Sequence, residues 1–96
     1  MGQRLLQRRL AQASARMREI REELGVVEDQ LAVLADDADD KSLRALVSET
    51  PAADHEYREA NRHAETMRRH RDALVTELAE LDARMNDLLD RMEPAP

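Results

Sequence analysis

The chain has 96 residues, of which 38% are charged and 42% are hydrophobic, and its formal net charge is −6 at pH 7. This length allows one small domain, which we place over residues 1–96, and the single aromatic residue, Tyr57, argues against a β-sheet core. The absence of cysteine excludes disulfide bonds and thiol chemistry.

The first predicted element is a long helix over about residues 3–36. Its apolar residues are separated alternately by three and four positions, and this spacing continues without a break. Such a spacing places them on one face of a helix, where they form a seam that packs against a second helix. The seam consists of Leu6, Leu10, Ala13, Met17, Ile20, Leu24, Val27, Leu31 and Leu34.

An acidic connector follows this seam. Its clustered aspartates are Asp36, Asp37, Asp39 and Asp40. We expect their solvated charge to end the first helix and one of them to cap a short helix over about residues 40–49. The short helix is expected to pack over the connected ends of the long helices. Its apolar residues are Leu43, Leu46 and Val47.

A second long helix is predicted over about residues 51–93, before a short proline-containing tail. Thr50 has the side chain of an N-cap, and Pro51 follows at the first helical position, where its missing N–H removes no hydrogen bond. The alternation of three and four residues recurs here and is interrupted only by Arg71, which we interpret as a polar residue that sets the register. The apolar residues of this second seam are Tyr57, Ala60, Ala64, Met67, Leu74, Leu78, Leu81, Met85, Leu88 and Met92.

Charge is segregated into blocks along the chain. Residues 1–21 and 57–71 are basic, whereas residues 22–56 and 72–96 are acidic. Folding the chain back on itself sets each basic block beside an acidic one, so the long helices are predicted to pair antiparallel. The predicted fold class is therefore all-α, an antiparallel two-helix coiled-coil hairpin with a short helix in the connecting segment.

The two seams align best when the numbers of paired residues sum to 98. Arg71 then falls opposite Val27, with Glu23 and Glu28 within reach. In this register several charged residues beside the seams are brought close to each other. They are Arg16 with Glu77, Glu28 with Arg68, and the like-charged pair Arg9 with Arg84.

Several apolar residues lie outside both seams. Val26 and Val33 share a second face of the first long helix, and the short helix contributes Leu43, Leu46 and Val47. We expect these five residues to contact another protein. Leftover apolar surface can also be covered in a homodimer, in which two hairpins make a four-helix bundle, and we expect this dimer to form as well.

No constellation in the sequence predicts an enzyme, a metal site or a cofactor. The clustered aspartates lack the glycine of a calcium loop, and the spacing of His55, His63 and His70 is not that of metal ligands. Direct nucleic-acid binding is not expected, because the chain is acidic overall and has no stacking aromatic residues apart from one tyrosine.

We predict a non-enzymatic protein–protein interaction module that serves as an adaptor, scaffold or assembly factor. The alternative is a regulator that docks its acidic hairpin tip, residues 36–40, on a nucleic-acid machine such as RNA polymerase. The segment His55–Ala60 resembles the start of the second helix in the hairpin of Gre-type transcript cleavage factors, although the acidic residues do not line up with the tip in that family. No run of residues has the pattern of a secretion signal or a membrane span, so we expect a cytoplasmic protein that does not bind membranes.

Overall fold

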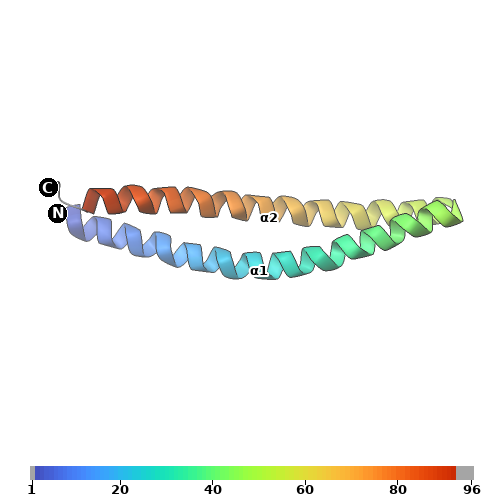
Figure 1. Cartoon of the computed structure of the whole chain (residues 1–96), viewed down its shortest axis with the longest axis horizontal. Coiled ribbons are helices and arrows are strands. Elements are labelled where there is room, and N and C mark those ends of the chain that lie inside the picture. Colours follow the sequence, from blue (N-terminus) through green and yellow to red (C-terminus); the bar gives the residue numbers. More distant parts are fainter. Residues whose placement is uncertain (1, 93–96) are drawn as a thin grey trace. The chain divides into compact units, whose positions relative to one another are not determined.

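The computed structural model describes residues 2–92 and contains two α-helices in this range, α1 (Gly2–Ser48) and α2 (Pro51–Met92) (Figure 1). No strand occurs among these residues, so the predicted all-α class is confirmed. The chain reverses direction between the helices, as expected for a helical hairpin. The predicted tail and Glu93 lie outside the described residues.

α1 is one continuous helix where the sequence predicted two. The predicted helix end near residue 36 and the separate short helix over residues 40–49 are therefore wrong. The physical reason is that the seam does not stop at Leu34 but continues at the same spacing through Ala38, Lys41 and Ala45, of which only Lys41 is polar. Ala38 is only 5% exposed, so burial holds this part of α1 in helical conformation.

The clustered aspartates are compatible with this helix because two of them form ion pairs with basic side chains four residues further along α1. Asp37 pairs with Lys41 at 3.0 Å, and Asp40 pairs with Arg44 at 3.1 Å. Pairs at this spacing stabilise a helix by about 0.2–0.5 kcal/mol each. The local charge therefore supports the helix that it was expected to end.

The turn between the helices occupies Glu49 and Thr50. Glu49 has a φ of 51°, the left-handed conformation common just after a helix, and its N–H donates to the carbonyl oxygen of Ala45 at 3.1 Å. The hydroxyl of Thr50 accepts a hydrogen bond from the N–H of Ala53 at 3.2 Å. This contact confirms the predicted N-cap, and α2 begins at Pro51 as expected.

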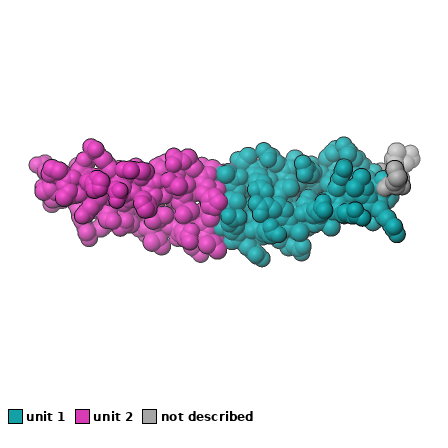
Figure 2. Space-filling view, turned by 180° about the vertical axis from the view of Figure 1, so that it is seen from behind, with its two compact units in different colours: residues 1–24, 73–96 teal, residues 25–72 magenta. Residues whose placement is uncertain are grey.

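The chain forms two compact units (Figure 2): unit 1 comprises residues 1–24 and 73–96, and unit 2 comprises residues 25–72. Each unit contains a segment of α1 and a segment of α2. In unit 1 the core uses large side chains, and Ile20 is 0% exposed. The other buried residues of unit 1 are Ala13, Met17, Leu74 and Leu88.

Unit 2 is built around smaller side chains. Its most buried residue is Ala64, which is 0% exposed. The other buried residues of unit 2 are Val27, Leu31, Ala38 and Ala60. Because the hydrophobic contribution scales with the apolar area removed from water, each alanine in this core contributes less than a leucine or isoleucine does in unit 1.

One contact between the helices supports the predicted register in unit 1. Arg16 donates from Nε to Oε2 of Glu77 at 2.8 Å and from Nη2 to Oε1 at 3.0 Å, as the register predicted. In unit 2, Arg68 pairs with Glu65 on its own helix, so the predicted pair with Glu28 does not form. Arg68 can reach Glu65, one turn away on α2, without extending its side chain across to α1.

Arg71 is a partly exposed residue of unit 2. Its guanidinium donates from Nε and Nη2 to Oδ1 of Asp72 at 3.1 and 3.0 Å. The charged group therefore reaches the surface while the side chain starts from a seam position, as long arginine side chains do. Its role in setting the register stays a prediction.

Candidate functional site

One face of α1 in unit 2 combines exposed apolar residues with aspartates. Seven residues follow each other on this face at alternating intervals of three and four positions, and all seven are exposed. At 3.6 residues per turn they form a continuous row that lies roughly opposite the buried seam of the same helix. We call this row the outward stripe: Val26, Asp29, Val33, Asp36, Asp40, Leu43 and Val47.

The apolar members of the outward stripe are well exposed, from 58% for Val26 to 86% for Val47. Leu46 is 72% exposed and lies beside Leu43 and Val47, near the end of α1 that adjoins the turn. With Val33, these are the five apolar residues among the predicted partner contacts, which also include the four clustered aspartates. The prediction that three of them cover the connected ends of the helices is wrong, because α1 continues through them and presents them to solvent.

The clustered aspartates lie within α1 and not at the turn. Asp40 precedes Ser48, the last residue of α1, by about two helical turns, so the predicted acidic hairpin tip is wrong in its position. Asp37 and Asp40 are paired with cations on α1. Asp36 and Asp39 are exposed and form no ion pair with a described residue. The cluster therefore adds a net negative charge to the side of α1.

Two shallow hollows adjoin the outward stripe. The first lies beside Val33, and Met67 of α2 forms part of its wall. The second lies beside Leu43 and Val47 and extends to Ala53 of α2. These hollows enlarge the apolar surface that a docked side chain would contact.

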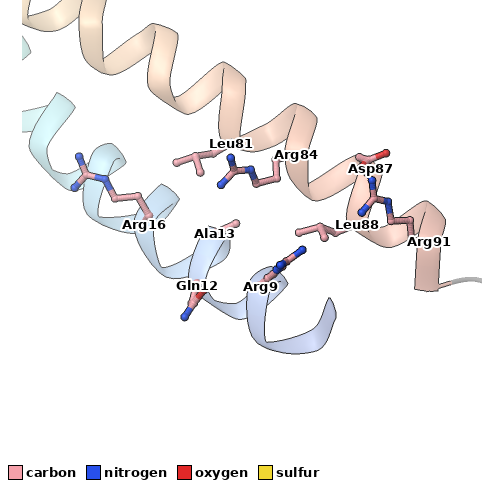
Figure 3. A pocket seen from close by; sticks show the side chains of 9 residues that line it. All are labelled: Arg9, Gln12, Ala13, Arg16, Leu81, Arg84, Asp87, Leu88 and Arg91. Atoms are coloured by element: carbon pink, nitrogen blue, oxygen red, sulfur yellow. Dashed lines mark ion pairs between the residues drawn. The ribbon is translucent and has the colours of Figure 1, made fainter. Parts of the chain in front are cut away.

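A groove between α1 and α2 in unit 1 gathers four arginines (Figure 3). Its volume is about 610 Å³, and Ala13, Leu81 and Leu88 form the apolar part of its lining. Two of the arginines come from α1 and two from α2. We call this site the arginine groove; its basic residues are Arg9, Arg16, Arg84 and Arg91, and Asp87 is the acidic residue of its lining.

Two arginines of the groove are bound to carboxylates. Arg91 pairs with Asp87 at 3.2 Å, and Arg16 binds Glu19 at 3.2 Å in addition to Glu77. The hydrogen bonds from Arg16 hold the pKa of Glu77 below its usual value. The same hydrogen bonds, to Glu77 first and to Glu19 second, raise the pKa of Arg16, so this guanidinium stays charged.

The other two arginines of the groove, Arg9 and Arg84, form no ion pair with a described residue. The register predicted that they lie near each other, and both line the same groove. In Figure 3 their side chains extend from different helices into the space between α1 and α2. Like charges that line one groove repel each other, and the four arginines outnumber the carboxylate of Asp87, so the groove carries a net positive charge.

Apart from these two surfaces, the described residues show few features that are typical of a catalytic or metal-binding site. No polar or charged residue in the range 2–92 is buried. Within the same range, no three histidine, aspartate or glutamate side chains are grouped so that they can hold a metal ion. Neither α1 nor α2 is long and apolar enough, over the residues described, to cross a membrane.

Comparisons with protein-family models, with curated proteins and with solved structures find no match to this chain. No relative therefore assigns a role to either surface. The outward stripe and the arginine groove are the two surface features of the described residues that bear on function.

Asp29 is the member of the outward stripe that the sequence analysis missed. The other six were identified, but the predicted helix end at residue 36 separated Val26 and Val33 from Leu43 and Val47. The signal was present in the sequence, because the spacing of three and four positions runs from residue 26 to residue 47. Only a continuous helix places these residues in one row.

Proposed function

We propose that this protein is a non-enzymatic coiled-coil interaction module that binds one helix of a partner protein along the outward stripe. The observation that carries this proposal is the spacing of exposed apolar residues on α1, which matches the spacing of residues in helices that pack lengthwise on each other. α2 already covers the buried seam of α1 in unit 2, so the outward stripe is the face left for another helix.

The charge of the outward stripe favours a partner helix that is basic as well as apolar. Asp29 and Asp36 lie between the apolar residues of the stripe, and Asp39 lies beside them, whereas Asp40 is already paired with Arg44. Lysine or arginine residues on the partner would pair with these carboxylates, whereas an acidic helix would be repelled. We therefore infer that the partner presents an amphipathic helix with basic residues flanking its apolar face.

A second copy of this chain is a poorer occupant of the stripe. Parallel pairing of two outward stripes would set each aspartate opposite its own copy. Antiparallel pairing centred between Asp36 and Asp37 would gather the clustered aspartates of both copies at the centre of the interface. Both arrangements bring like charges together, which is costly where water is excluded. We therefore infer that the partner on the outward stripe is a different protein, and the homodimer expected from the sequence stays a prediction.

The energies fit a reversible complex. Complete burial of an exposed valine or leucine contributes about 1.5–3 kcal/mol. The five apolar residues of this surface are already partly covered, so they supply less than the full amount. Because association itself costs about 4–15 kcal/mol, only part of this gain remains as binding free energy, and we expect an affinity no tighter than micromolar.

Two synthetic helical peptides test this proposal. Both carry leucine at the seam positions, and the flanking positions are lysine in one peptide and glutamate in the other. We expect the lysine peptide to bind with micromolar affinity in fluorescence anisotropy, and the glutamate peptide to bind at least about tenfold more weakly. Replacing Leu43→Gln together with Val47→Gln should weaken binding of the lysine peptide at least about tenfold, because two apolar contacts are lost.

The matched control is the double variant Leu5→Gln with Leu89→Gln, which removes two exposed apolar residues from unit 1. It should bind the lysine peptide as the wild-type chain does, and circular dichroism should show that both variants remain helical. Equal binding of the two peptides, or equal binding by the Leu43/Val47 variant, contradicts the proposal. A dimer that is lost in the Leu43/Val47 variant, detected by sedimentation equilibrium, also contradicts it, because a second copy then occupies the stripe.

Docking on a nucleic-acid machine through an acidic tip gains no support from the positions of these residues. The turn itself is formed by Glu49 and Thr50, and the clustered aspartates lie earlier, within α1. Asp37 and Asp40 are each engaged by a cation on the same helix. We therefore retain the partner helix on the outward stripe as the single proposed function.

A further inference from the structure

We propose that the arginine groove of unit 1 binds a small organic phosphate, a phosphate monoester with a compact apolar body. This inference does not depend on the partner helix proposed above. The arginine groove lies in unit 1 and shares no residue with the outward stripe, which lies in unit 2. Each proposal therefore fails or succeeds in its own experiment.

The first argument is the net positive charge of the groove, where four arginines and Asp87 form the charged part of the lining. Arg16 and Arg91 are satisfied by carboxylates of this chain. Arg9 and Arg84 project into the groove from two helices and form no ion pair with a described residue (Figure 3). In a chain with a net charge of −6, this groove is a local reversal of sign. A bound anion would replace the repulsion between the two guanidinium groups by attraction.

The second argument concerns the charge and shape of that anion. Guanidinium groups present planar forks of donors that match the oxygens of phosphate and carboxylate groups. The guanidinium groups of Arg9 and Arg84, which form no ion pair with a described residue, are best neutralised by one group that carries two negative charges. A phosphate monoester carries about −1.5 to −2 at pH 7, whereas a single carboxylate carries one charge. Arg9 and Arg84 together therefore favour a phosphate monoester.

The third argument is the apolar lining beside the charges. Ala13, Leu81 and Leu88 line the groove between the arginines. The volume of about 610 Å³ lies in the usual range for small-molecule sites, roughly 300–1,000 Å³. Inorganic phosphate would leave these apolar side chains uncovered, whereas the organic part of an ester would cover them. The ligand class that fits is an ester with an apolar group attached to its phosphate.

Phenyl phosphate is a suitable probe because it joins a phosphate to an apolar ring. Calorimetric titration of the full chain should show one site, with affinity at least about threefold higher for phenyl phosphate than for inorganic phosphate or for benzoate. Arg9→Gln and Arg84→Gln should each lower the affinity for phenyl phosphate at least about tenfold. Both side chains are exposed, so neither change removes a core contact.

The matched control is Arg18→Gln, which removes the same charge from an exposed arginine of unit 1 that does not line the groove. It should bind phenyl phosphate within about twofold of the wild-type chain. Without ligand, Arg84→Gln should have the same or a higher unfolding midpoint at low salt, because one of the like charges that line the groove is removed.

Three results would overturn the proposed phosphate site. The first is the absence of binding at concentrations up to roughly 10 mM phenyl phosphate. The second is an equal loss of affinity in Arg18→Gln and Arg84→Gln, which would indicate attraction by the general field of the arginines. The third is equal affinity for phenyl phosphate and benzoate, which would show that the groove does not prefer a phosphate over a singly charged carboxylate.

Discussion

Units 1 and 2 are built from the same two helices, yet they place their large apolar residues differently. Unit 1 buries Ile20 and Leu88 and leaves Leu5, Val75 and Leu89 about half-exposed. Unit 2 relies on alanines in much of its core and exposes five large apolar residues, which are more exposed than those of unit 1. The apolar material of unit 1 therefore faces mainly inward, whereas much of that of unit 2 faces outward.

This difference separates stability from recognition along one pair of helices. Stability depends on the apolar area that each unit removes from water, so we expect unit 1 to resist local unfolding better than unit 2. Exposed apolar residues arranged in a row are typical of a surface that contacts another protein. Unit 2 thus combines the thinner core with the better candidate for recognition.

The largest expected effect comes from the core of unit 1. Ile20→Ala removes a side chain that is 0% exposed, and we expect the free energy of unfolding to fall by about 2–5 kcal/mol. Urea unfolding followed by circular dichroism measures this change. The control Val33→Ala shortens an apolar residue that is 68% exposed and should change the free energy by less than about 0.5 kcal/mol. A comparable loss in both variants would remove the distinction between inward and outward apolar residues.

An intermediate effect is expected from enlarging the core of unit 2. Ala64 is 0% exposed, so Ala64→Leu forces the helices apart and should lower the free energy of unfolding by about 1–3 kcal/mol. Ala32→Leu makes the same change at an exposed position of unit 2 and should have little effect. If Ala64→Leu stabilises the chain in urea unfolding, the core of unit 2 has unfilled space and is not the tightly packed small-residue core described above.

The smallest expected effect is a pH dependence from the pair that links the helices of unit 1. Because Arg16 lowers the pKa of Glu77 in the folded chain, the folded state binds fewer protons at this group than the unfolded state. The stability that this pair contributes is complete above the pKa that Glu77 has in the unfolded chain. It is lost as the pH falls through the lower pKa that Glu77 has in the folded chain. Glu77→Gln should therefore lose less stability than the wild type between about pH 5 and pH 3.

Thermal unfolding midpoints at neutral and acidic pH measure this pH dependence. The difference should be small, because both side chains of the pair are partly exposed and solvent screens the interaction. The control Glu80→Gln removes an exposed carboxylate that pairs with no described residue, and it should follow the wild-type curve. Parallel curves for wild type and Glu77→Gln would mean that the pair with Arg16 does not persist in solution.

Much of the hairpin was predictable because its signals are local. Thr50 and Pro51 define the start of α2 by backbone chemistry alone, and the structure has the expected hydrogen bond at the N-cap. The contact between Arg16 and Glu77 followed from matching the two seams. That same register, with paired numbers summing to 98, has its midpoint at residue 49, where the turn lies. The register thus already contained the evidence that α1 continues to residue 48.

The candidate surfaces were predicted only in part, since their residues come together through the continuity of α1 and the pairing of helices. Leu43 and Val47 were recognised as unpaired apolar residues, but their alignment with Val26 and Val33 required an unbroken helix. Arg9 and Arg84 were recognised as a mismatch. That they share one groove with an apolar lining is a property of the packed helices.

The sequence by itself determined two long antiparallel helices, because the spacing of apolar residues and the chemistry of the N-cap act over a few positions. Only the tertiary structure decided whether the clustered aspartates end α1 or continue it. Solvated aspartates are compatible with either outcome, and the burial of Ala38 in unit 2 supplies the energy that selects the helix. That choice places Leu43, Leu46 and Val47 on the surface, where a partner can reach them.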